Sequence, residues 1–528
     1  RIAANGRVVT FNTAAALVPQ DNNGVRDVYA VELDTGAVER ISVDSGGSGG
    51  PNESVGYADL SADGRLVAFV SASELGLPFS TPGIKAFVRD RTQGVTVVAG
   101  ASSSGQEALR VTFCGLSANG QHVFFSTDEN FLAPLDTNGT FDVFVRDLHT
   151  GVTELVSRAL NGLSGNSASG GIFRNADISA DGRFVAFCSN ASNLVAGDTN
   201  NREDVFVRDR LLGSTDRVSI GASGQQANHH SLGWASVSHD GRYVAFMSFA
   251  SNLDVADTNG VEDCFVRDRW SGTTTCVSRG VSGVAATGAS TYPQLSADAR
   301  FVAFTSGAPD LVQGDTNGHA DAFLLDRLSG ALSRISVDAS GAEGNSFSFL
   351  PMLSGGARSV AFLSRATNLV PGDSNGVDDV FVLRCPAIQS YCTAGVSSNG
   401  CAAMMSASGT PSLSAAGGFT LRADGVDAQR SGLIFYGVGQ RQALPVAGST
   451  SWFCIRPPVQ RTPLGFSGGS GVCDGAFARD WLAFINTSPG ALGQPFGVGV
   501  LVQAQAWYRD TPIQSSAFSN ALEFVVEP

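Results

Sequence analysis

The sequence contains almost no lysine. Of its 34 basic residues one is a lysine, Lys85, and the others are arginines, while 48 acidic residues give a formal net charge of −14. Such a surface disfavours nucleic acid and anionic membranes, because both carry dense negative charge. We therefore expect no nucleic acid partner. The acidic surface is compatible with cation binding.

Long apolar runs are also missing. No stretch approaches the roughly 18 consecutive apolar residues that a membrane-spanning helix requires, so we expect no membrane insertion. Glycine, in contrast, is abundant, with 63 residues among 528. This abundance indicates many tight turns and therefore many short strands.

Convincing catalytic motifs are absent as well. Residues 46–50 and 465–469 match G-x-S-x-G, but neither match sits on a strand-to-helix turn, and no motif places a partner histidine. Such matches arise by chance in a chain this rich in glycine and serine. His229 and His230 are adjacent on an extended segment, where their side chains point to opposite faces. We predict no catalytic residues from these patterns.

One pattern is repeated seven times along residues 1–384. Its clearest copies begin at Ser179, Ser238 and Ser296. An aromatic residue of the V-A-F segment recurs at spacings of 56 to 62 residues, mostly 58 or 59, at Phe11, Phe69, Phe125, Phe187, Phe246, Phe304 and Phe362. Self-similarity at a fixed period indicates stacked units that cannot bury their faces alone.

Each repeat reads as four short strands. In the copy at residues 234–278, turn residues separate four apolar segments rich in β-branched and aromatic side chains, as expected for strands. Four strands in each of seven units predict an all-β fold with a seven-bladed β-propeller over residues 1–384. A β-helix is the alternative, but its rungs are far shorter than about 58 residues.

The pattern S-A-D-G-R-x-V-A-F followed by D-V-F-V-R-D resembles the TolB-type, WD40-like propeller repeat over roughly residues 1–384. This resemblance implies the fold and not an activity, because the family includes periplasmic adaptors, peptidase-gating domains and secreted proteins of unknown role.

Six of the seven repeats carry an acidic loop, D-x-N-G/N-x-x-D, between their second and third strands. Oxygen donors at positions 1, 3 and 7, with a turn-forming residue at position 4, can wrap Ca²⁺, and a backbone carbonyl and waters can complete its shell. The predicted ligands are Asp21, Asn23 and Asp27; Asp136, Asn138 and Asp142; Asp198, Asn200 and Asp204; Asp257, Asn259 and Asp263; Asp315, Asn317 and Asp321; and Asp373, Asn375 and Asp379.

A metal-free explanation of these loops remains open. Asp and Asn favour such turns by bonding their own backbone, and the final Asp can cap the incoming strand. In the second repeat, residues 80–86 replace the loop and place Lys85 next to the closing position, which Ala86 takes. A lysine there would repel a cation, so we expect this site to be lost.

The repeat stops after Leu383, and residues 385–528 read as short apolar strands separated by Gly, Ser and Pro turns. They predict a small β-sandwich that contains disulfides. The segment at residues 391–401 and the closing segment at 502–510 resemble a C-terminal domain that recurs in secreted proteins of environmental bacteria. This resemblance implies no activity.

Five of the nine cysteines lie in this tail. No Cys-x-x-Cys pair or Cys/His cluster indicates zinc, so oxidised pairs in an extracytoplasmic compartment are the simpler interpretation. In the tail we expect Cys392–Cys401 and Cys454–Cys473, with Cys385–Cys401 as the alternative.

The four remaining cysteines belong to the repeats. Cys264 and Cys276 flank a hairpin turn on adjacent strands and are predicted to form a disulfide. Cys114 and Cys188 lie in apolar strands of different repeats and are predicted to be buried free thiols.

The expected function is that of a secreted bacterial protein, extracellular or at the cell surface. In this hypothesis a calcium-stiffened, non-enzymatic module binds a protein or glycan or builds a surface assembly. The alternative is an extracellular hydrolase or lyase, or its accessory propeller, with a site in the central channel. Near-identical repeats place equivalent groups around that channel, which suits binding better than the unlike acid and base of catalysis.

The repeats also predict an unfinished ring, because the last one lacks a fourth strand and the first lacks most of its inner strand. An open sheet edge invites another strand. We expect it to come from a segment upstream of Arg1, from the linker near residues 387–391, or from a neighbouring molecule. The last case would generate a filament.

Overall fold

The computed structural model describes the chain except for residues 51, 53, 76–81, 172–175, 329, 385–387, 392–396, 398, 413, 439–440, 446–451, 456, 489, 494–495, 497–499, 510–516 and 527–528. The chain divides into two compact units, Arg1–Cys385 and Pro386–Pro528. Within the described ranges, no helix has the length and apolar character needed to cross a membrane.

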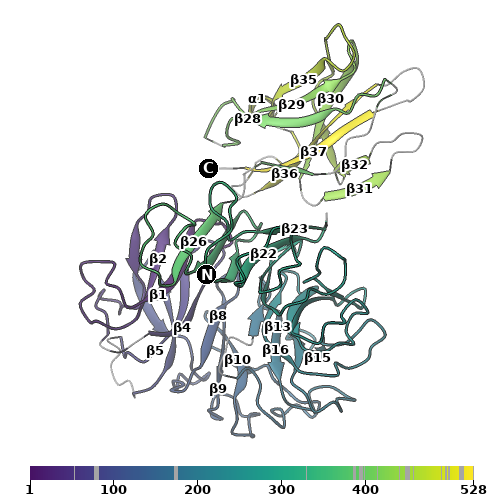
Figure 1. The fold of residues 1–528 in the computed structure, drawn as a ribbon. Coiled ribbons are helices and arrows are strands. Elements are labelled where there is room, and N and C mark those ends of the chain that lie inside the picture. The colour runs from purple at the N-terminus through teal and green to yellow at the C-terminus, as the bar shows by residue number, and fades with distance from the viewer. Residues whose placement is uncertain are drawn as a thin grey trace. The chain divides into compact units, whose positions relative to one another are not determined.

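The described part of the first unit forms seven antiparallel sheets, one from each repeat (Figure 1). Each sheet keeps its strands in chain order, so each is one blade of a β-propeller. We number the blades one to seven along the chain.

The first and last blades have three strands, β1–β3 (Val8–Thr13, Asp27–Glu32, Val38–Arg40) and β24–β26 (Ser348–Leu353, Ser359–Ser364, Asp379–Arg384). Blades two to six have four strands, namely β4–β7 (Ser54–Leu60, Leu66–Ser71, Lys85–Asp90, Val95–Val98), β8–β11 (Phe113–Leu116, His122–Thr127, Asp142–Asp147, Thr153–Leu155), β12–β15 (Ala176–Ile178, Phe184–Ser189, Asp204–Asp209, Ser214–Arg217), β16–β19 (Ser231–Val237, Tyr243–Ser248, Asp263–Asp268, Thr273–Cys276) and β20–β23 (Ser290–Leu295, Phe301–Ser306, Asp321–Asp326, Ala331–Arg334).

The recurring aromatic residue of the repeat lies at the centre of its blade. Phe246 faces Phe265 across two paired strands, and their ring centroids are 5.8 Å apart. Every residue of β14 and of β18 is buried, because neighbouring blades cover both faces of these strands. This double burial explains why the strands read as continuous apolar runs rather than as alternating patterns.

Blade seven packs against blade one. Ile2 and Val9 of blade one share an apolar cluster with Leu350 and Met352 of blade seven. The backbone N–H of Gly355 also donates to the carbonyl of Ala4 at 2.9 Å. Side-chain packing therefore closes the ring, and no pairing between named strands joins these two blades in the described part of the chain.

The open edge of blade seven is strand β26. Within the described ranges it pairs only with β25. The linker does not fill this edge, because β27 (Ile388–Tyr391) pairs with β37 (Ala517–Val525) in the second unit. The expectation that these linker residues complete blade seven is therefore wrong.

The described part of the second unit has a six-stranded sheet, a three-stranded sheet, a strand pair and one helix. The first sheet runs β27-β37-β36-β30-β33 with β34 also on β30, the second runs β28-β29-β35, and β31 pairs with β32. The bounds not yet given are β28 (Met404–Ser408), β29 (Thr420–Val426), β30 (Ser431–Val438), β31 (Arg441–Pro445), β32 (Trp452–Ile455), β33 (Val459–Arg461), β34 (Gly465–Phe466), β35 (Gly475–Asp480), β36 (Leu501–Tyr508) and α1 (Trp481–Thr487).

One buried cluster joins these elements. It contains Leu421 of the smaller sheet, Tyr436 and Phe524 of the larger sheet and Trp481 of α1. The two sheets therefore share one core. The helix, which the sequence pattern did not predict, begins after Asp480, whose side chain accepts a hydrogen bond from the backbone N–H of residue 483 at 3.0 Å.

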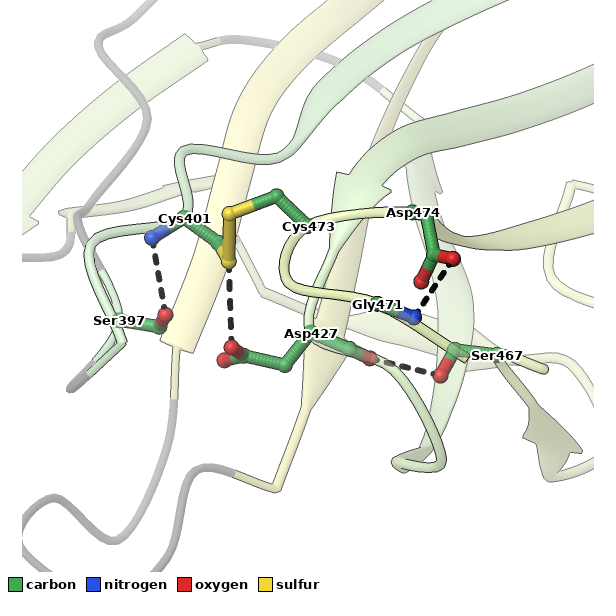
Figure 2. The surroundings of a disulfide bond; sticks show 7 residues. All are labelled: Ser397, Cys401, Asp427, Ser467, Gly471, Cys473 and Asp474. Carbon is green, nitrogen blue, oxygen red and sulfur yellow. Dashed lines mark hydrogen bonds between the residues drawn. A yellow bond between two sulfur atoms is a disulfide. The ribbon is translucent and has the colours of Figure 1, made fainter. Parts of the chain in front are cut away.

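A disulfide in this unit joins Cys401 to Cys473 (Figure 2). Cys401 precedes β28 and Cys473 precedes β35, and these strands flank β29 antiparallel to it. Both cysteines therefore lie at the same end of the three-stranded sheet, although 72 residues separate them in the chain. The predicted Cys392–Cys401 and Cys454–Cys473 pairs, and the alternative Cys385–Cys401, are wrong. Cys454 is disulfide-bonded, and Cys385 and Cys392 lie outside the described residues.

The disulfide predicted between Cys264 and Cys276 is also wrong, because both are buried free thiols. The register pairs Cys276 with Phe265, one residue away from Cys264. This shift puts the two side chains on opposite faces of blade five, where Cys264 packs towards blade six and Cys276 towards blade four. Cys188 is a buried free thiol as predicted, and Cys114 is buried.

Candidate cation pockets in the blades

The closing aspartate of each acidic loop is the first residue of the strand that corresponds to the third strand of a four-stranded blade; in blade one this strand is β2. In blade three, Asp142 begins β10, and its Oδ1 accepts a hydrogen bond from the Ser157 hydroxyl at 2.5 Å. Blades one, four, five and six repeat this bond at 2.5 to 2.6 Å, in the pairs Ser42–Asp27, Ser219–Asp204, Ser278–Asp263 and Ser336–Asp321. The closing aspartate thus ties the third strand to the segment that follows the outer strand.

The loop asparagine stabilises the loop through side-chain hydrogen bonds. In blade three, Nδ2 of Asn138 donates to Asp142 Oδ2 at 2.7 Å and to the carbonyl of Gly165 at 2.9 Å, and Oδ1 accepts from the N–H of Thr140 at 2.8 Å. Equivalent bonds are made by Asn23, Asn200, Asn259 and Asn317. These bonds account for the asparagine through loop stability.

An arginine lies between the two aspartates in three blades. In blade one, Nη2 of Arg40 is 2.7 Å from Asp27 Oδ2, and Nη1 is 3.5 Å from Asp21 Oδ1. At 3.1 to 3.5 Å the same bridge is made by Arg217 to Asp198 and Asp204 in blade four and by Arg334 to Asp315 and Asp321 in blade six. In these blades the protein supplies the cation itself.

Blades three and five lack this arginine. In the register of the outer strand, the position of Arg40 is taken by Leu155 in blade three and by Cys276 in blade five. The first aspartates of these loops, Asp136 and Asp257, are only 5% and 4% exposed. Neither of their carboxylate oxygens accepts a hydrogen bond of good geometry.

The carboxyl pKa values reflect this environment. Burial raises the pKa of Asp142 to about 8, and the nearby Asp136 carboxylate adds to the effect, while bonds from Ser157 and Asn138 oppose it. Burial, together with the Asp263 carboxylate, raises the pKa of Asp257 to about 6. Two carboxylates buried close together without a counter-charge disfavour ionisation. Both pockets therefore favour the uptake of positive charge.

Blade two carries a lysine at the closing position. Lys85 is the first residue of β6, where the other blades have the closing aspartate. The sequence alignment that put Ala86 at that position is therefore wrong by one residue. The buried Lys85 ammonium group donates to Glu107 Oε2 at 2.7 Å. This blade also supplies its own cation.

The loop of blade seven matches the acidic sequence pattern, but its side chains are not fully buried. Asn375 is exposed, and Asp373 and Asp379 are only half-buried. Asn375 Oδ1 accepts from the N–H of Val377 at 3.0 Å. Among the described residues, no fourth strand covers this side of the blade.

Sequence reasoning located the carboxylates but missed the arginines. The sequence contained a signal for these arginines, because each of them follows the closing aspartate of its loop by 13 residues, at Arg40, Arg217 and Arg334. Across the described ranges, no three His, Cys, Asp or Glu side chains gather as a metal-binding group. A metal in a two-carboxylate pocket would take its other ligands from carbonyls and water.

Apolar side chains of the inner strands form a cluster that draws on several blades. Trp234, Tyr292 and Leu350 occupy equivalent places on the inner strands of blades five, six and seven, at positive φ angles of 74°, 56° and 54°. Trp234 packs edge-on against Tyr292 with ring centroids 5.1 Å apart, and it joins the cluster that contains Ile2 and Leu350. This cluster therefore draws on blades one, five and seven, with Tyr292 of blade six packed against it.

Charged side chains of the inner strands connect neighbouring blades. Asp59 Oδ2 accepts from the N–H of Leu116, and Asp177 Oδ2 accepts from the N–H of Val237, both at 3.0 Å. Asp59 also lies 3.3 Å from the guanidinium of Arg1. These carboxylates hold adjacent blades together.

No protein-family model and no curated protein matches this sequence. The chain is similar in structure to TolB from Acinetobacter baumannii, at 14% identity and a TM-score of 0.33, over 57% of each chain. It is similar to the β-propeller domain of the Trilobed protease from Pyrococcus furiosus, described as having an open velcro topology, at 12% identity and a TM-score of 0.44, over 71% of this chain and 92% of that one. It is also similar to an oligogalacturonate lyase in complex with manganese, at 13% identity and a TM-score of 0.44, over 73% of this chain and 88% of that one.

These similarities concern the fold alone. The blades define the class of the protein, an all-β chain with a β-propeller whose repeat resembles the TolB type.

Proposed function

We propose that the chain is a non-enzymatic module that binds a protein or glycan outside the bacterial cytoplasm. The observation that supports this proposal is the apolar cluster of the inner strands, which brings Trp234 of blade five together with residues of blades one and seven. A catalytic site needs unlike reactive groups around a space that a substrate can enter. The described inner strands present apolar side chains there, together with carboxylates that join blades.

Two further features support a location outside the cytoplasm. The Cys401–Cys473 disulfide is of a kind that persists in oxidising compartments. The acidic, lysine-poor composition disfavours nucleic acid as a partner. A protein or glycan partner fits these features.

Turnover assays test the non-enzymatic part. The similar structures include an oligogalacturonate lyase with manganese and an acylaminoacyl peptidase, so the folded chain is assayed with oligogalacturonate plus Mn²⁺ and with acylated peptides. We expect rates equal to those of the heat-denatured chain, with an authentic lyase and peptidase as positive controls. Turnover that requires the folded chain would overturn the proposal.

A glycan array and a panel of soluble extracellular proteins test the binding part, with the unfolded chain as control. Saturable binding of a glycan or protein by the folded chain alone is expected. Its absence from both panels would count against the proposal.

A further inference from the structure

Blades one to six place charged groups at one equivalent position between the third strand and the loop before it. Four of these blades fill the position with a cation from the protein. Blades one, four and six use Arg40, Arg217 and Arg334, and blade two uses Lys85. The position is therefore built for positive charge.

Blades three and five keep the same frame and lack the cation. Their closing aspartates bond to a serine and an asparagine as in the arginine-filled blades. Only the occupant of the arginine position differs, being Leu155 or Cys276. Neither a leucine nor a neutral thiol can balance two carboxylates.

In blades three and five, the first aspartate of the loop is buried without a balancing positive charge. Both oxygens of Asp136 and both oxygens of Asp257 are buried and accept no hydrogen bond of good geometry. Burying a carboxylate without a partner is strongly unfavourable. The equivalent carboxylates Asp198 and Asp315 each lie within 3.3 Å of an arginine nitrogen. In blades three and five, a cation from solution would supply the positive charge that the arginine supplies in blades four and six.

We propose that blades three and five each bind one Ca²⁺ ion, at the place that the guanidinium occupies in blades one, four and six. Its ligands are Asp136 and Asp142 in blade three and Asp257 and Asp263 in blade five, with carbonyl oxygens and water completing the shell. This reduces the six calcium loops expected from the sequence to two. It stands independently of the proposed function.

Calcium stoichiometry tests the proposal. The full chain is stripped with chelator and titrated with CaCl₂ by isothermal calorimetry, after circular dichroism has confirmed that it is folded. The expected result is two ions per chain. No binding by the folded chain, or binding at all six loops, would overturn it.

Matched amide substitutions locate the ions. Asp136→Asn and Asp257→Asn should each lower the stoichiometry from two to one. Asp198→Asn changes the equivalent residue of an arginine-filled blade and should leave it at two. Equal effects of all three variants would overturn the assignment to blades three and five.

Exchanging the residues at the arginine position of blades three and four gives the sharpest contrast. Leu155→Arg copies the arginine-filled blades and should remove the ion of blade three. Arg217→Leu copies blade three and should create a third site in blade four. If Leu155→Arg does not fold, Asp136→Asn decides the same question. Unchanged stoichiometry in the folded exchange variants would contradict the proposal.

Discussion

At the scale of single residues, a buried guanidinium bridges the two aspartates of the loop in blades one, four and six. The side chains of Arg40, Arg217 and Arg334 are 5%, 9% and 10% exposed, so water screens their bridges weakly. A buried ion pair is not strongly stabilising by itself, but removal of one partner leaves the other charge buried and unpaired. The arginine and its two aspartates are therefore interdependent.

Arg334→Leu tests this dependence. The substitution leaves Asp315 and Asp321 buried without their counter-charge, and it also removes the 2.7 Å contact of Arg334 with Glu343. In calcium-free buffer we expect the free energy of unfolding to fall by about 3–5 kcal/mol, the typical effect of breaking a buried pair. Chemical denaturation followed by circular dichroism measures it.

The matched control is Arg365→Leu. The Arg365 side chain is 55% exposed and pairs with a partly exposed carboxylate, Asp378. Exposed pairs contribute at most about 1 kcal/mol. Similar losses in the two variants would contradict the role assigned to the buried arginine.

At the scale of strands, register decides which side chains meet. Cys264 and Cys276 lie on adjacent strands but one residue out of register, so they face different blades. Cys401 and Cys473 are distant in sequence but precede two strands that flank a common neighbour. Sequence spacing predicts the wrong disulfide in both cases, because it does not show which side chains face one another.

Cysteine mapping tests this register. The chain is unfolded without reductant, alkylated, digested and analysed by mass spectrometry. We expect alkylated Cys188, Cys264 and Cys276, and a disulfide-linked peptide pair containing Cys401 and Cys473. A linked Cys264–Cys276 peptide would show that the strand register described for blade five is wrong.

Strands such as β14 and β18 could be predicted from the sequence because each is buried on both faces and therefore reads as an apolar run. The loops likewise revealed where carboxylates gather. The arginines could not be placed, since their approach to the aspartates depends on the register of the outer strand. The same limit applies to Lys85, whose side chain was assigned one position away from its place in β6.

The inner strands show a further limit of the sequence pattern. Trp234 adopts a positive φ at an irregularity of its strand, a conformation that bulky residues rarely take. No local propensity predicts it. Packing with residues of other blades holds the side chain there, and this packing becomes visible only when the blades are assembled.

At the scale of the whole molecule, one apolar cluster connects several blades of the propeller. The cluster around Trp234 draws on blades one, five, six and seven, so this side chain joins parts of the ring that are not neighbours. Its loss should affect the stability of the unit as a whole.

Trp234→Ala tests that role. Trp234 is 5% exposed, and removing a buried tryptophan side chain costs about 3–5 kcal/mol. Trp270→Ala is the control, because Trp270 is 71% exposed on a hairpin turn of the same blade. We expect a large loss of unfolding free energy only for Trp234→Ala. Comparable small losses in the two variants would contradict the role assigned to Trp234.

The most direct test of the cation pockets is an anomalous difference map from crystals of the full chain grown with calcium and then soaked in a lanthanide. The predicted result is one peak between Asp136 and Asp142 and one between Asp257 and Asp263, with Ca²⁺–oxygen distances of about 2.3–2.6 Å in the calcium crystals. The arginine-bridged pairs of blades one, four and six should show none. Peaks at those bridged pairs, or no peak in blades three and five, would contradict the claim that each buried carboxylate pair takes one cation.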